Sequence, residues 1–201
     1  GLVMRQRGRG TTVSYLMPVS AFSADFNGLM KNLIAIGAST DVEVLSFDYV
    51  TAPAPIADAL RLKSGTLVQR AERCRSRDRK PFSYILSFLP EDIGRSFARN
   101  DLTDKPILSL IEKAGHQIHE ANQSVTAVLA DPVFSSALKV QQGSPLIKLT
   151  RVVLDQTSRP VKYTEVVYRP DVYQLNMNLR RVTGTQHGAN MWQTEEAHTP
   201  D

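Results

Sequence analysis

Two stretches of the chain share one alternation of apolar and polar positions and predict the same pair of strands. In residues 65–89, a glycine precedes a run rich in apolar and β-branched types, then a polar turn, then a proline and a second such run. Residues 143–168 repeat this order with one extra residue in the turn. The pattern is typical of a β-hairpin whose second strand begins at proline, where a missing N–H is tolerated. Matching positions are Gly65 and Gly143, Arg73 and Arg151, Pro81 and Pro160, and Tyr84 and Tyr163.

The repeat also limits the architecture. Two copies are too few for a solenoid, which needs at least about three repeats to bury its faces. They favour a closed, pseudo-symmetric sheet with a site between its two halves.

Outside the hairpins, the pattern predicts several short elements. Residues 20–37 have the period of an amphipathic helix laid on a sheet. Asp104 and Gly115 would cap and close a helix at 105–114. Strands that outnumber helices favour an α+β domain with a mostly antiparallel β-sheet and helices on one face. Further strands are expected at 41–50, 116–130 and 172–182, and further helices at 56–60, 91–99 and 131–138.

Length and composition bound the class of protein. A chain of 201 residues with 42% hydrophobic residues can bury one main core, so we expect a single main domain. No apolar run approaches the roughly 18 residues of a transmembrane helix, and the N-terminus lacks the apolar stretch of a signal peptide. Cys74 is the single cysteine and cannot form an intrachain disulfide. These features predict a cytoplasmic protein.

Positive charge is concentrated in the first hairpin. Residues 61–80 contain eight Lys or Arg and two acids, and residues 5–9 contain three Arg. On a strand, Arg73, Arg75 and Arg77 point to one face because side chains alternate with period two. Guanidinium groups bind carboxylate or phosphate in a bidentate manner, so this row indicates an anion site. The alternative is a solvated, charged strand that resists aggregation.

Residues 1–13 predict two short strands around a Gly-rich basic turn. Their order, Gly-Leu-Val, then Arg-Gln-Arg-Gly-Arg-Gly-Thr, then Val, resembles the wing that ends the winged helix-turn-helix of GntR-superfamily repressors. The resemblance implies that Arg5, Arg7 and Arg9 contact DNA phosphates or the minor groove. It also implies a recognition helix, absent from this sequence, that reads operator bases. A generic basic hairpin would show the same pattern.

The second repeat carries a more specific resemblance. Residues 138–143 read Leu-x-Val-x-x-Gly, and residues 159–173 contain Arg-Pro, Glu-Val-Val-Tyr and Arg-Pro-Asp-Val-Tyr. The first repeat agrees through the Arg-x-Arg of residues 73–75. Together these motifs resemble the UTRA effector-binding domain of HutC-subfamily GntR regulators, whose fold is similar to that of chorismate lyase. The expected organisation is a wing and linker remnant at 1–13, the UTRA domain at 14–182 and a disordered acidic tail at 183–201.

This resemblance implies a small, often anionic effector that binds between the two halves and changes operator affinity. Arg73 and Arg75 match the family's Arg-x-Arg, which often holds a phosphate or carboxylate. Glu165 and Tyr168 match its second-half Glu and Tyr, and Tyr84 completes the predicted effector site. For Glu165, a structural salt bridge to Arg151 is the alternative.

One departure from the family affects the predicted effector. The family often has Glu four positions after the first-hairpin proline, where this chain has Ile85. The effector is therefore expected to be less hydroxylated than a sugar. Because operators have two half-sites, a homodimer is expected as well.

Other function classes receive less support from the residues. His116 and His119 are spaced like metal ligands, but no acid or cysteine cluster joins them, so no metal and no cofactor are expected. No Ser-His or Cys-His arrangement can be placed, so no catalytic residue is assigned. A chorismate-lyase-like enzyme remains the alternative on the same fold, although it would have no use for a wing. A plain dimerisation module would leave the arginine row unexplained.

Overall fold

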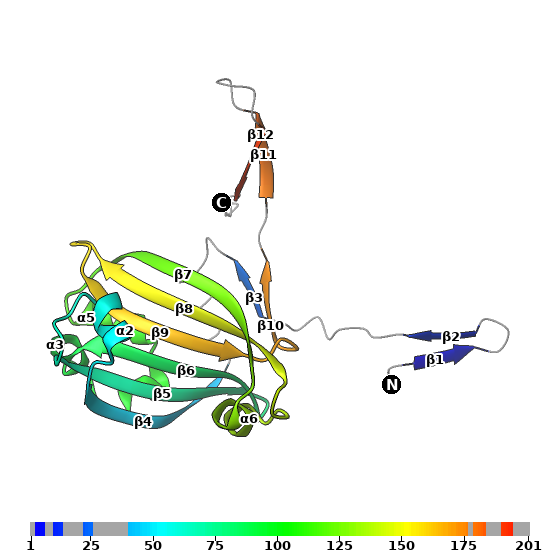
Figure 1. Cartoon of the computed structure of the whole chain (residues 1–201), viewed down its shortest axis with the longest axis horizontal. Coiled ribbons are helices and arrows are strands. Elements are labelled where there is room, and N and C mark those ends of the chain that lie inside the picture. The colour runs from blue at the N-terminus through cyan, green and yellow to red at the C-terminus, as the bar shows by residue number, and fades with distance from the viewer. Residues whose placement is uncertain are drawn as a thin grey trace.

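A six-stranded antiparallel sheet forms the centre of the molecule (Figure 1). The structure, a computed structural model, describes residues 3–6, 10–13, 22–25, 40–176, 179–183 and 190–194, with side chains within 40–173. The strand order across the sheet is β4-β5-β6-β9-β8-β7. The bounds are β4 Asp41–Thr51, β5 Leu67–Arg77, β6 Lys80–Pro90, β7 Ile118–Leu129, β8 Pro145–Asp155 and β9 Pro160–Tyr168.

Each of the two repeated stretches forms an antiparallel hairpin, β5 with β6 and β8 with β9. The hairpins meet along β6 and β9, where Leu86 lies opposite Glu165. These two residues are counterparts when Tyr84 is aligned with Tyr163 along the repeat. Exchanging β5 with β8 and β6 with β9 gives the same arrangement read from the opposite edge of the sheet. The sheet therefore has a pseudo-twofold axis at this central pair.

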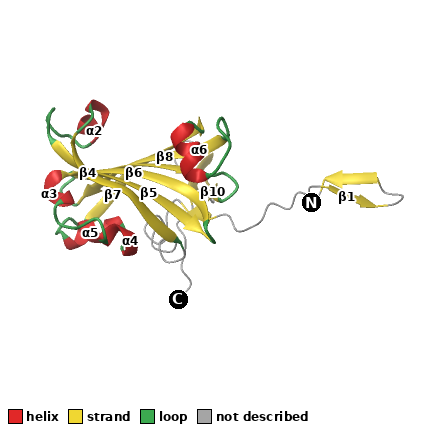
Figure 2. Cartoon of the chain, turned by 90° about the horizontal axis from the view of Figure 1, so that it is seen from below, coloured by secondary structure: helices red, strands yellow, loops and turns green. Residues whose placement is uncertain are grey.

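Helices lie on both faces of the sheet (Figure 2). On one face, here named the α2/α6 face, α2 Ala54–Ala59 packs near Val68 and α6 Pro132–Leu138 packs near Val167. On the opposite face, named the α5 face, Ala71 and Val153 pack in one apolar cluster with the remaining helices. These are α3 Glu91–Gly94, α4 Asp101–Asp104 and α5 Ile107–Lys113.

The expectation that helices cover one face is therefore wrong, although the α+β class and the antiparallel sheet are confirmed. The physical reason is that the central strands are apolar on both sides. Val68 and Phe88 face α2, whereas Ala71 and Leu89 face α5. Burial of apolar surface drives packing, so both sides need a cover. Among the described residues, no helix is long and apolar enough to cross a membrane.

Most predicted elements of the sheet and its helices are confirmed within a few residues, with two exceptions. The first is Asp104, which ends α4 and does not cap α5, because α5 begins after Pro106 without a side-chain cap. The second is the helix predicted at residues 20–37. It is wrong at β3 Phe22–Asp25, and the rest of that range lies outside the described residues. Asp131 does cap α6, since the Phe134 N–H donates to its Oδ1 at 2.7 Å.

Three strand pairs complete the description. β1 Val3–Gln6 pairs antiparallel with β2 Gly10–Val13, as predicted for residues 1–13. The expected strand at 172–182 is divided into two strands with different partners. The segment expected to be a disordered tail contains a paired strand, so that expectation does not hold there. The pairs are β10 Tyr173–Asn176 with β3, in parallel, and β11 Leu179–Thr183 with β12 Asn190–Thr194, antiparallel.

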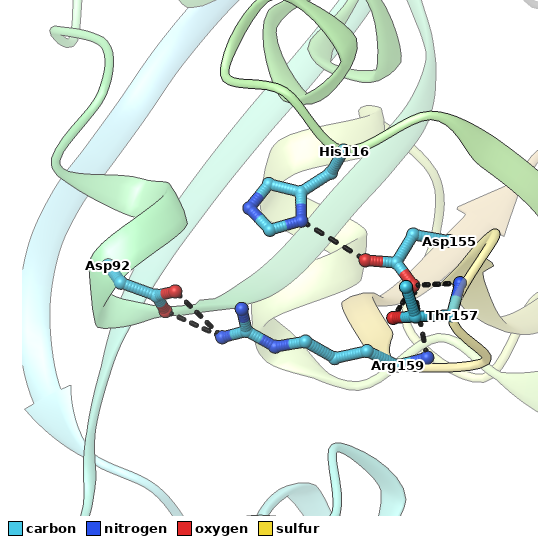
Figure 3. A network of polar contacts seen from close by, with 5 residues as sticks. All are labelled: Asp92, His116, Asp155, Thr157 and Arg159. Atoms are coloured by element: carbon cyan, nitrogen blue, oxygen red, sulfur yellow. Dashed lines mark hydrogen bonds and ion pairs between the residues drawn. The ribbon is translucent and has the colours of Figure 1, made fainter.

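A polar network closes the turn between β8 and β9 (Figure 3). Asp155 Oδ1 accepts hydrogen bonds from Thr157 N at 2.9 Å, Thr157 Oγ1 at 2.7 Å and Arg159 N at 3.1 Å. Its Oδ2 lies 3.1 Å from His116 Nδ1, and the Arg159 guanidinium pairs with Asp92 at 2.7 Å. Burial raises the pKa of Asp155, but the hydrogen bonds from Thr157, His116 and Arg159 outweigh it and bring the pKa to about 2.

Replacing Asp155 by alanine should lower the free energy of unfolding by about 1–3 kcal/mol, because the turn donors lose a charged acceptor. The folded pKa lies below the ordinary 3.8, so this contribution is complete above pH 3.8 and is lost as the pH falls through about 2. Urea denaturation of both proteins over acidic pH measures the difference. Asp48→Asn, an exposed residue of β4, is the control. A difference that does not shrink toward pH 2 would contradict this role.

Candidate anion-binding site

The register of the sheet places the predicted arginines and Tyr168 on one face. Arg73 lies opposite Ile85, and Arg75 lies opposite Ser83, which in turn lies opposite Tyr168. Residues directly opposite in an antiparallel ladder share a face, and every second residue of a strand returns to it. Arg73, Arg75 and Tyr168 therefore lie on the α5 face with Ala71.

Two further cations lie on the same face. Arg151 pairs with Thr164 across β8 and β9, and Lys162 pairs with Val153, a member of the α5 cluster. Arg73, Arg151 and Lys162 are 3%, 5% and 4% exposed, so these long charged side chains are nearly removed from solvent. Lys and Arg are almost never fully buried unless they are paired.

No carboxylate among residues 40–173 forms an ion pair with any of these four cations. Their hydrogen-bond partners in that part of the chain are neutral oxygens. Arg75 Nη1 donates to Thr40 Oγ1 at 2.9 Å, and Arg151 Nε donates to Gln123 Oε1 at 2.9 Å. Within residues 40–173, the buried Nε of Arg73 has no hydrogen-bond partner. We refer to Arg73, Arg75, Arg151 and Lys162 as the cation cluster.

The titration of these groups reflects this burial. Burial lowers the pKa of Arg73 to about 9, with the charge of Arg75 adding to the effect. The pKa of Lys162 is lowered well below 10.5, first by burial and then by the charges of Arg73, Arg151 and Arg75. A buried charge is costly unless an opposite charge and hydrogen bonds compensate it. The cluster therefore offers a strong driving force for binding an anion.

Hydroxyl groups complete the surroundings of the cluster. Ser83 Oγ and Thr164 Oγ1 are buried and have no hydrogen-bond partner among the residues whose side chains are described, although most buried polar atoms have one. Tyr168 stacks on Tyr173 with ring centroids 4.0 Å apart, and burial raises its pKa to about 12. Cationic donors and neutral hydroxyls on one face suit the recognition of phosphate or carboxylate oxygens.

Two predicted site residues, Glu165 and Tyr84, lie on the opposite face of the sheet from Arg73 and Tyr168. Leu86 and Glu165 are opposite each other on the α2/α6 face, one residue out of phase with Arg73 and Tyr168. Glu165 pairs with Lys148 at 2.9 Å and accepts a hydrogen bond from Tyr163 Oη at 2.8 Å. The predicted convergence of Glu165 with the arginines is therefore wrong, and so is its alternative salt bridge to Arg151.

Tyr84 is misplaced for the same reason. It lies opposite Cys74 and Val167, which belong to the α2/α6 face. Its ring contacts Phe134 of α6 edge-on, with centroids 5.6 Å apart. Tyr84 is thus part of the apolar contact with α6 and does not approach Arg73.

The sequence analysis missed Lys162, Arg151 and Thr164 as members of the site. Counting back from Tyr168 in steps of two would have found Lys162 and Thr164, because residues 168, 166, 164 and 162 share a face. Arg151 was noted as the repeat counterpart of Arg73, and that relation was the available signal. Local motif matching selected Glu165 because it ignored which face the residue occupies.

The remaining candidates have ordinary roles or lie outside the described side chains. Cys74 is buried, its Sγ lies 3.6 Å from the Ala137 carbonyl oxygen, and burial raises its pKa, in agreement with an inert thiol. His116 belongs to the Asp155 network, and no metal-binding group of three ligands occurs among the described residues. Arg5 lies in β1, whereas Arg7 and Arg9 lie outside the described residues.

Comparisons with known proteins identify the family and the fold. A sequence profile of the UTRA domain family matches residues 35–174. An HTH-type transcriptional regulator of Mycobacterium tuberculosis is 26% identical over 186 residues, covering 90% of this chain and 67% of that protein. The HTH-type transcriptional regulator GgaR of Escherichia coli is 26% identical over 176 residues, covering 86% and 68%. The ligand-binding domain of a GntR-family transcriptional regulator from Bordetella bronchiseptica has a TM-score of 0.66 and 27% identity, covering 70% of this chain and 91% of that one.

Lys162→Met tests whether the buried ammonium group opposes folding. Its folded pKa lies below 10.5, so between that pKa and 10.5 the unfolded state holds more protons and stability rises with pH. Methionine has a similar length without the charge, so the variant should have a higher melting temperature at neutral pH than the wild type. Its melting temperature should also rise less steeply with pH.

Thermal denaturation from about pH 6 to about pH 8 measures both the melting temperature and its dependence on pH, and it stays below the pKa of about 9 at which Arg73 titrates. Lys148→Met, on the opposite face, is the matched control because its ammonium is paired with Glu165. A Lys162→Met protein that melts below the wild type at every pH would show that the lysine stabilises the unliganded fold.

Proposed function

We propose, since the chain belongs to the UTRA domain family of GntR-type regulators, that it is the effector-sensing and dimerisation domain of a HutC-type transcriptional repressor. Its effector is a small anionic metabolite that binds over Arg73, Arg75 and Tyr168 on the α5 face. Binding changes the affinity of the complete regulator for operator DNA. The domain acts in the cytoplasm as a sensor and carries out no reaction of its own.

The buried cation cluster carries this proposal. Three nearly buried cations and the adjacent Arg75 have no carboxylate partner within residues 40–173. Charge-assisted hydrogen bonds to an anion contribute about 1.5–3 kcal/mol each. A site with this unpaired charge gains more from an anion than from a neutral ligand, because the anion also removes the repulsion between the cations.

The connection to DNA is supported by the first strands. β1 and β2 form the short antiparallel hairpin expected of a wing, and the proposal assigns Arg5, Arg7 and Arg9 to DNA phosphates or the minor groove. A recognition helix elsewhere in the complete regulator would read the bases. Chorismate-lyase-like catalysis is not proposed, since the described part of the site presents cations and hydroxyls and no feature that favours a reaction.

Inorganic phosphate is a suitable first probe of the site. Millimolar phosphate should raise the melting temperature of the domain, and Arg73→Gln should weaken phosphate binding by about 10- to 150-fold, the equivalent of one charge-assisted hydrogen bond. Arg79→Gln is the matched control, because Arg79 is exposed in the β5–β6 turn. Isothermal titration and thermal shift at constant ionic strength provide the measurements.

Two outcomes would contradict the assignment of this site. Phosphate binding that is equally strong in wild type and Arg73→Gln would place the anion elsewhere. A melting temperature that falls equally with and without phosphate would show that Arg73 is purely structural.

The domain should also be a homodimer, because a repressor of an operator with two half-sites holds its two reading heads together. Light scattering of the purified chain gives the mass in solution. A single monomeric species at micromolar concentration would contradict the dimerisation role and leave the effector site unaffected.

A further inference from the structure

We propose that the effector carries two separate anionic groups, one held by Arg73 and Arg75 and the other by Arg151 and Lys162. This inference rests on the proposed function, since it specifies the chemical class of the effector of the same site. The molecule it fits is a short dianion, such as a dicarboxylate or a phosphorylated acid.

The placement of the cations supports two anchoring points. Arg73 and Arg75 lie two positions apart on β5. Arg151 and Lys162 lie on the adjacent strands β8 and β9, one cross-strand pair apart on the α5 face, since Arg151 pairs with Thr164 and Val153 pairs with Lys162. Strands are spaced about 4.8 Å apart, so β5 and β8, separated by β6 and β9, lie about 14 Å apart. The two pairs therefore approach a ligand from opposite halves of the sheet.

The amount of charge leads to the same conclusion. Each hairpin contributes two of the four cations, and Arg73 and Arg151 are repeat counterparts across the pseudo-twofold axis. A single carboxylate held by Arg73 and Arg75 would leave Arg151 and Lys162 of the other hairpin without an opposite charge. Both pairs are compensated only when the effector carries an anionic group at each end, because an unpaired buried charge is strongly unfavourable.

The surface between the two pairs indicates the spacer. Ile85 and Val166 lie opposite each other in the middle of the α5 face, and Ser87 and Thr164 form the neighbouring pair. Thr164 Oγ1 is buried without a partner, so one hydrogen-bonding group on the spacer would satisfy it. The spacer is therefore short and largely apolar, with few hydroxyl groups.

Lys162 provides a second, independent signature of the dianion. The charges that face it are Arg73 and Arg75 from β5 and Arg151 from β8, and all three disfavour its protonated form. An anionic group beside Lys162 reverses that bias, so binding at the second anchor takes up a proton. A dianion takes up more protons than an anion at the first anchor alone, because it adds a second negative charge beside the lysine.

The experiment compares two matched pairs of probes by isothermal titration at constant ionic strength. 3-Phosphoglycerate and glycerol 3-phosphate share a phosphate and a three-carbon chain, but only the first has a carboxylate. Glutarate and 5-hydroxypentanoate differ in the same way without phosphate. Titrations in buffers of different ionisation enthalpy give the number of protons taken up.

We call the probe of each pair that lacks the second anionic group the monoanchored probe. In the wild type, at least one dianion should bind roughly 10-fold or more tightly than its monoanchored probe, as expected for one added charge-assisted contact. Its binding should also take up more protons. Arg151→Gln and Lys162→Met should each bring that ratio toward 1 while changing binding of the monoanchored probe by less than about 3-fold. Lys162→Met should also remove the extra proton uptake. Lys148→Met, which removes the same charge from the opposite face, should retain the full preference.

Other results would separate the inference from the proposed function. Probes that bind in an Arg73-dependent way but show no dianion preference, or a preference that survives in both Arg151→Gln and Lys162→Met, would overturn the two-anchor effector alone. No binding by any of the four probes, together with no phosphate binding, would overturn the anion site itself and with it the inference.

Discussion

The pairing of β6 with β9 at Leu86 and Glu165 determines on which side of the sheet each charged residue lies. A slip of one residue in this central ladder would move every side chain of one hairpin to the other face. In the observed register, the four members of the cation cluster share the α5 face, and none of them pairs with a carboxylate within residues 40–173. The α2/α6 face receives matched pairs, such as Lys148 with Glu165 and Arg70 with Glu72. Charge is thus sorted by register, and this sorting creates the candidate site.

The sorting has an energetic consequence for the unliganded protein. The cations on the α5 face oppose folding through desolvation and mutual repulsion, whereas apolar contacts on both faces stabilise it. Groups with strongly perturbed pKa values often mark functional sites, because selection for stability alone would replace or pair them. An external anion offsets the cost, so ligand binding and folding stability should be linked in this domain.

The local structure could be predicted from the sequence, because strands and turns depend on patterns of neighbouring residues. Proline and glycine positions marked both hairpins, and the period of two along a strand placed Arg73 and Arg75 on one face. Long-range register was not accessible in the same way. Glu165 was chosen from its motif although it is three residues from both Lys162 and Tyr168, and an odd separation reverses the face of a strand.

Other misses have the same origin in tertiary context. The stripe of apolar residues in 20–37 has a helical period, yet Phe22–Asp25 pair with β10, a strand far along the chain. Lys162 carries no motif; period two places it on the face of Tyr168, but only the tertiary structure shows its burial beside three arginines. Asp104 has the chemistry of a helix cap, but the neighbouring α4 uses it as its own last residue.

The most direct test of the central claim is a crystal structure of the domain soaked in selenate, with anomalous data collected at the selenium edge. The account predicts an anomalous peak within hydrogen-bonding distance of Arg73 and Arg75 on the α5 face, and loss of that peak in Arg73→Gln. An α5 face whose cations are all paired with carboxylate side chains, with selenate confined to the surface, would contradict it.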